Sequence, residues 1–78
     1  MADRETYLAF AESLKPELEE FRMQLEPLES GGMTIGKREQ GGDWEDITQD
    51  EIAFLKRAIG AFEDLIEKAT GIANAQRP

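Results

Sequence analysis

The chain contains no cysteine and no histidine. Their absence excludes disulfide bonds, zinc sites built from these side chains, cysteine nucleophiles and imidazole general bases. A domain of 78 residues buries a modest fraction of its surface, so it commonly needs disulfides, a metal or a partner subunit for stability. Of these supports the composition favours association with another subunit, and we expect no cofactor.

Positive charge and long apolar runs are also scarce. The net charge is −8, with nine basic residues against seventeen acidic ones. Repulsion from phosphate groups argues against direct binding to nucleic acid or to anionic membranes. No apolar run approaches the about 20 residues of a membrane-spanning helix, and the initial "MADRETYLAF" lacks the basic and apolar parts of a signal peptide. We therefore expect a cytoplasmic protein.

Apolar side chains recur near the start of the chain at alternating spacings of four and three. Their positions are Tyr7, Ala11, Leu14, Leu18, Phe21, Leu25 and Leu28. This is the a/d seam of a coiled coil or helical bundle, and it predicts a helix with Asp3 as its N-cap. Pro16 leaves two alternatives, a kinked single helix or two successive helices, and the unbroken heptad phase favours the first. Pro27 predicts that the helix ends near Glu26.

A second run of the same kind occupies the last third of the chain. Its positions are Ile52, Leu55, Ile59, Phe62, Ile66, Ala69 and Ala73. Thr48 and Glu51 match a capping box, and Ile47 and Ile52 match the accompanying hydrophobic staple, which together predict the helix start. Gly71 suits the left-handed position that follows a helix end.

These signals predict a mainly α fold, an antiparallel hairpin of two helices. The predicted ranges are a helix over about 3–26, a connection over about 27–47, a helix over about 48–70 and a tail over 71–78. Apolar residues beside the seams, such as Phe10 and Leu65, make each apolar stripe wider than one partner helix covers. We therefore expect a homodimer that forms a four-helix bundle. The alternative is a monomer whose spare apolar face binds a different protein.

The connection is longer than the two to eight residues that commonly join two helices. Ile35 and Trp44 are placed to face each other on a small β-hairpin, with Gln40, Gly41 and Gly42 in the turn. In one interpretation, which we favour, this β-hairpin folds back onto the end of the bundle through Met33, Ile35 and Trp44, with Trp44 as its anchor. In the other it projects and binds another protein. The candidate partner-binding residues are then Ile35, Lys37, Arg38 and Trp44.

Motifs for catalysis or metal binding are weak. The acidic cluster around Trp44 lacks the spacing of a calcium loop, and "GGMTIGK" lacks the spacing and the hydroxyl residue of a phosphate-binding loop. We expect no enzyme and no metal site. The stretch "PELEEFRMQLEPLE" holds five glutamates, Glu17, Glu19, Glu20, Glu26 and Glu29. They form either a solvated helix face or a surface that mimics a row of phosphates.

The run "MTIGKREQGGDWEDITQDEIAFLKRAIGAFEDLI" resembles a pattern in short uncharacterised bacterial and prophage proteins. The resemblance covers about residues 25–66. It implies a small accessory protein of bacterial or phage origin, and it carries over no catalytic residues. We expect a non-enzymatic protein that works through protein–protein contact as a homodimer. The alternative is a phage- or mobile-element-encoded inhibitor of a host nucleic-acid enzyme, such as an anti-defence protein.

Overall fold

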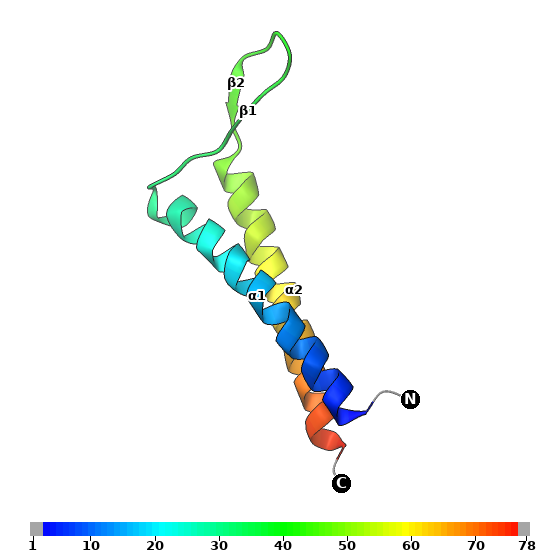
Figure 1. Cartoon of the computed structure of the whole chain (residues 1–78). Coiled ribbons are helices and arrows are strands. Elements are labelled where there is room, and N and C mark those ends of the chain that lie inside the picture. Colours follow the sequence, from blue (N-terminus) through cyan, green and yellow to red (C-terminus); the bar gives the residue numbers. More distant parts are fainter. Residues whose placement is uncertain (1–2, 77–78) are drawn as a thin grey trace.

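The computed structural model of the chain describes residues 3–76. In chain order the elements are α1 (Arg4–Ser30), β1 (Gly36–Arg38), β2 (Trp44–Asp46) and α2 (Thr48–Ala75). The two helices lie side by side and antiparallel, and the two strands form a β-hairpin beyond one end of them (Figure 1). The structure confirms the predicted mainly α helical hairpin with a small β-hairpin in its connection.

The helices contact each other through the two predicted seams, since every seam residue is buried or half-buried. The centre of the core lies near the β-hairpin end, where Leu25, Leu28, Ile52 and Leu55 form one buried cluster. Leu55 is the most deeply buried of these, at 1% exposure. Farther along, the rings of Phe21 and Phe62 meet edge to face, with centroids 5.2 Å apart.

The first helix begins as predicted and ends later than predicted. The side chain of Asp3 caps it by accepting from the N–H of Thr6 at 2.9 Å. It continues as one helix through Pro16, as the heptad phase indicated, but the predicted end near Glu26 is wrong. The helix passes Pro27 and stops at Gly31, which has a φ of 83°. Packing explains the difference, because a helical course after the proline is what brings Leu28 into the core.

The second helix also runs past its predicted end, reaching Ala75 instead of residue 70. Gly71 lies inside the helix and has no positive φ. The seam continues beyond this glycine, because Ala69 and Ala73 are 4% and 0% exposed against α1. Burial of the last seam residue therefore outweighs the modest cost of a glycine in a helix interior.

The predicted capping box at the start of α2 does not form. Thr48 is the first helical residue, and the N-cap residue Ile47 has no side-chain hydrogen bond. Instead, the carboxylate of Asp46 accepts from the backbone N–H of Thr48 at 2.9 Å and from its hydroxyl group. This Asx-type turn leaves the Thr48 hydroxyl available to the connection rather than to Glu51.

The molecule is long and only one layer of helices thick, with extents of 61 × 26 × 15 Å. Its radius of gyration is 17.7 Å, whereas a compact chain of this length has about 11.5 Å. Its accessible surface is 6070 Å², against roughly 4,800 Å² for a compact protein of the same mass. The fold therefore leaves a large surface that a second layer would cover.

Candidate functional site

The projecting β-hairpin is the first candidate surface. Its strands pair antiparallel, with Gly36 opposite Asp46, Lys37 opposite Glu45 and Arg38 opposite Trp44. The turn lies where the sequence predicted it. The N–H of Gly42 donates to the carbonyl of Glu39 at 2.8 Å, and Gly41 has a φ of 78°. Trp44 thus faces Arg38 and not Ile35, which was the predicted pairing.

The β-hairpin is held to the helices by Ile35 and Thr48. The side chain of Ile35 packs against the buried cluster. Its N–H donates to the hydroxyl of Thr48 at 3.0 Å, and its carbonyl accepts from the N–H of Ile47 at 2.9 Å. The hydroxyl and N–H of Thr48 also hold the pKa of the Asp46 carboxyl below its ordinary value of 3.8. One buried hydroxyl therefore joins the connection, the second strand and the start of α2.

Trp44 does not anchor the β-hairpin to the bundle, so this part of the favoured interpretation is wrong. The strands extend beyond the helices (Figure 1), and 69% of Trp44 is exposed. Its indole ring lies against the backbone of Gly36, where an added Cβ would be 2.0 Å from Nε1 and Cε2 of the ring. The ring therefore rests on the neighbouring strand at Gly36, two residues before its strand partner Arg38, and presents its other side to the solvent.

The four predicted partner-binding residues are only partly brought together. Side chains directly opposite each other in an antiparallel pair lie on the same face of the sheet. Trp44 and Arg38 consequently share one face, while Lys37 lies on the other face with Glu45. Arg38 also donates from Nε to the carbonyl of Gly42 at 3.1 Å, which ties it to the turn. Ile35 belongs to the anchor described above and not to the projecting surface.

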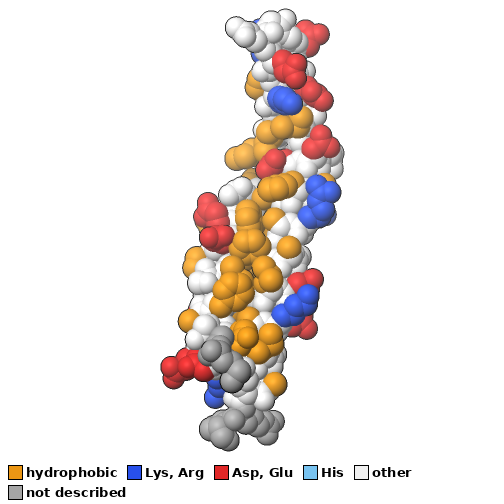
Figure 2. Space-filling view, turned by 90° about the vertical axis from the view of Figure 1, so that its right-hand side faces the viewer, with side chains coloured by type: hydrophobic (Ala, Val, Ile, Leu, Met, Phe, Trp, Pro, Cys, Tyr) orange, Lys and Arg blue, Asp and Glu red, His pale blue; other side chains and the backbone are white. Residues whose placement is uncertain are grey.

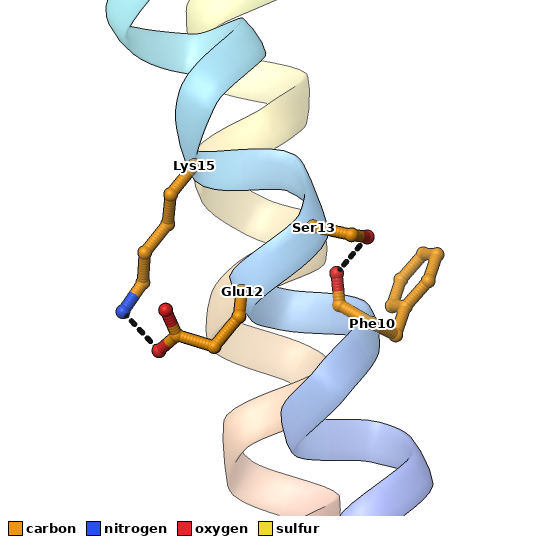
Figure 3. A network of polar contacts seen from close by, with 4 residues as sticks. All are labelled: Phe10, Glu12, Ser13 and Lys15. Atoms are coloured by element: carbon orange, nitrogen blue, oxygen red, sulfur yellow. Dashed lines mark hydrogen bonds and ion pairs between the residues drawn. The ribbon is translucent and has the colours of Figure 1, made fainter.

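The two long sides of the helical hairpin differ in chemistry. On one side Arg22 pairs with Glu63 at 2.9 Å, and Lys56 pairs with Glu29 at 2.9 Å. Lys15 precedes Arg22 by seven residues and so lies on this same side of α1. Figure 3 shows Lys15 and Glu12 on one side of this helix and Phe10 projecting from the other.

The opposite side is the second candidate surface, which we call the apolar face. Two positions along a helix correspond to a turn of about 200° around its axis. Ala58 and Leu65 therefore lie on the opposite side of α2 from Lys56 and Glu63, which they follow by two positions. The apolar face consists of Phe10, Leu14, Phe21, Phe54, Ala58, Ala61, Leu65 and Ile72. Several of its large side chains are about half exposed, among them Phe10 at 45% and Phe54 at 52%. Figure 2 shows apolar side chains in a stripe along the length of the molecule, with charged residues on both edges.

A groove of about 370 Å³ lies near the β-hairpin end of the molecule. Its apolar lining comes from both helices and from the connection, and includes Met23, Pro27, Leu28, Met33 and Ile35. Glu20 and Glu51 also line it. Sequence patterns did not indicate this groove, because Met33 lies in an irregular segment that has no periodicity.

The glutamates of α1 do not all behave alike. Glu19 lies 3.9 Å from Arg22, and Glu29 pairs with Lys56. Glu17, Glu20 and Glu26 form no ion pair within residues 3–76. The five glutamates therefore fall into a group near basic side chains and a group without such partners. The interpretation of this stretch as a phosphate mimic stays a prediction.

Metal sites and membrane-spanning helices would leave recognisable features in residues 3–76. In that part of the chain no group of three or more acidic side chains is placed to hold a metal ion. No helix in it is both long and apolar enough to cross a membrane. Comparisons of the chain with models of protein families, with curated proteins and with solved structures gave no match. The apolar face, with the groove near its end, and the projecting β-hairpin remain the candidate surfaces described above.

Proposed function

We propose that the chain is a non-enzymatic protein–protein interaction protein that works as a homodimer, with the apolar faces of two helical hairpins forming a four-helix bundle. The observation that carries this proposal is the apolar face, which extends along both helices and which the chain itself leaves uncovered. The chain exposes roughly 1,300 Å² more than a compact protein of its mass. A standard interface buries about 800 Å² on each partner, so one such contact fits within this excess.

Two exposed alanines of α2 provide a matched test of the dimer. Ala61 lies on the apolar face, whereas Ala53 is turned by about 80° from Ala61 around the helix, away from that face. The substitutions Ala61→Glu and Ala53→Glu add the same charge to the same helix. By sedimentation at micromolar concentration, the wild type and Ala53→Glu should show twice the chain mass of 8.8 kDa. Ala61→Glu should shift the population towards single chains. A wild type that sediments as a single chain, or equal effects of both substitutions, would contradict the proposal.

The projecting β-hairpin supports a second contact, made with a different protein. Tryptophan and arginine are enriched among the residues that dominate binding energies, and here Trp44 and Arg38 share one face of the strands. One side of the indole ring lies against Gly36, and 69% of the Trp44 residue is exposed to solvent. A large apolar ring held in place at the tip of a long molecule loses little conformational entropy on binding.

The opposite face of the β-hairpin offers the control for this contact. Trp44→Ala and Lys37→Ala change one exposed side chain each on opposite faces of the strands. In pull-downs from a bacterial lysate, Trp44→Ala should lose the partner and still form the dimer, while Lys37→Ala should retain both. Equal losses for the two variants, or loss of the partner together with the helical structure, would argue that the β-hairpin is only structural.

A further inference from the structure

Two copies of the chain can join their apolar faces in two symmetric ways. A two-fold axis along the molecule places both β-hairpins at the same end and sets α1 of each copy against α2 of the other. A two-fold axis across the molecule places the β-hairpins at opposite ends and sets like helices together. In either case the contacts of the two copies are equivalent. We propose the same-end arrangement, an inference that rests on the homodimer proposed above.

The two edges of the apolar face carry opposite charges. Glu17 follows Phe10 by seven residues and Glu20 lies one turn further, so both lie along the α1 edge. Lys68 follows Ala61 by seven residues and lies on the α2 edge. None of these three charged side chains forms an ion pair within residues 3–76. The negative charges of the α1 edge and the positive charge of the α2 edge are therefore available to form ion pairs with a second copy.

Contacts between the helices fix how far along the molecule each charge lies. Because the two helices are antiparallel, the numbers of two residues at the same height have a nearly constant sum. This sum is 83 for the ring contact of Phe21 with Phe62, and 85 for each of the two ion pairs between the helices. By this relation Lys68 lies level with residues 15–17 of α1. It is therefore level with Glu17 and about one turn from Glu20.

The two arrangements bring different charges together. In the same-end dimer a residue lies equally far along the molecule in both copies. Lys68 of each copy therefore lies beside Glu17 and Glu20 of the other copy. In the opposite-end dimer α1 crosses α1 near its middle, which is Glu17, and the glutamates of the two copies face each other. Opposite charges at such positions stabilise helix contacts, and like charges destabilise them. Asp64 lies one turn before Lys68 on the outer side of α2, farther from the contact.

The groove offers the same-end dimer a place for one large side chain. By the same relation, Phe54 lies level with residues 29–31 of α1, at the height of the groove. Phe54 of the second copy would then enter beside Pro27 and Met33, which line it. This contact would remove from water a phenyl side chain that is 52% exposed in the single chain.

Distances between the two copies distinguish the arrangements directly. Because the chain has no cysteine, a single Gln40→Cys or Asn74→Cys substitution gives one labelled site per copy, at the β-hairpin turn or near the opposite end. Paired spin labels should lie within about 30 Å for both sites in the same-end dimer, since packed helix axes are about 10 Å apart. In the opposite-end dimer, whose axis passes near Glu17, the two Gln40 labels would be separated by at least about the length of the molecule, 61 Å. Asn74 lies level with residues 9–11 of α1, close to that axis, so its labels stay within about 30 Å in both arrangements and report only that a dimer has formed.

Charge reversal gives a second readout that needs no label. Glu17→Lys should raise the dimer Kd by about 2- to 30-fold, because it breaks two equivalent surface ion pairs in the same-end dimer. Adding Lys68→Glu to the same chain should restore the affinity. In the opposite-end dimer Glu17→Lys would instead relieve repulsion and lower the Kd.

The outcomes separate the two proposals. Short distances for both labels, with weakening by Glu17→Lys and rescue by Lys68→Glu, support the same-end dimer. A distance near the molecular length between the Gln40 labels, or tighter association of Glu17→Lys, overturns the same-end arrangement and leaves the homodimer standing. A wild type that stays a single chain overturns the homodimer, and the arrangement with it.

Discussion

Replacing Thr48 by valine should release the β-hairpin from the helices. The two side chains have nearly the same shape, but valine cannot accept the hydrogen bond from the N–H of Ile35 or donate to Asp46. Thr48 is 7% exposed, so water cannot readily replace the lost acceptor. Leaving the Ile35 N–H without a partner should cost about 1–3 kcal/mol, or a fall in melting temperature of at least about 4 °C for a domain of this size.

Thr48→Ser is the control, because it keeps the hydroxyl group and removes only a methyl group. Urea unfolding should be followed by circular dichroism for the wild type and both variants at one chain concentration, since association changes apparent stability. Amide hydrogen exchange should show faster exchange of the Ile35 N–H in the valine variant. Equal stabilities of Thr48→Val and wild type, or a serine variant as unstable as the valine variant, would refute the role of this hydroxyl.

Three further predictions concern the core, the β-hairpin and the helix caps. Leu55→Ala should destabilise the chain by about 2–5 kcal/mol in urea unfolding, because this side chain is 1% exposed at the centre of the buried cluster. Gly36→Ala should displace the indole of Trp44, since the added Cβ would lie 2.0 Å from ring atoms; the indole N–H resonance should shift while the helix resonances stay unchanged. Hydrogen bonds to Thr48 lower the folded-state pKa of Asp46 below 3.8, so its contribution is present above 3.8 and lost as the pH falls through the folded value. The stability difference between wild type and Asp46→Asn should therefore shrink below pH 3.8, and unfolding curves that keep the same difference there would contradict this cause.

The helices could be predicted because their signal is periodic and repeated. Residues such as Leu18 and Leu25 recur at heptad spacing, and each is buried where the seam places it. The helix ends could not be predicted as well, because single residues decide them against competing packing. Pro27 and Gly71 both indicate an end, yet the burial of Leu28 and Ala73 carries each helix past it.

The place and the turn of the β-hairpin were predicted, but its pairing was not, and its anchorage was predicted only in part. Ile35 packs against the core as expected, whereas Trp44, the larger apolar side chain that was expected to be the anchor, stays exposed. The spacing Asp46-x-Thr48 is typical of an Asx turn and was a signal for the real helix start. The sequence prediction used the pairing of Thr48 with Glu51 instead, because that pair matches a capping box. The groove depends on three separate segments that meet only in the fold, so no local pattern indicated it.

The position of Trp44 has a consequence for how unfolding of this protein is observed. It is the single tryptophan of the chain, and it lies on Gly36, outside the buried cluster that holds the helices together. Its fluorescence therefore reports the closing of two three-residue strands and not the melting of the helices. The single tyrosine, Tyr7, lies in the first turns of α1, towards the other end of the molecule (Figure 1). The chain thus carries one natural fluorophore near each end, and the difference between their transitions measures how independently the two ends open.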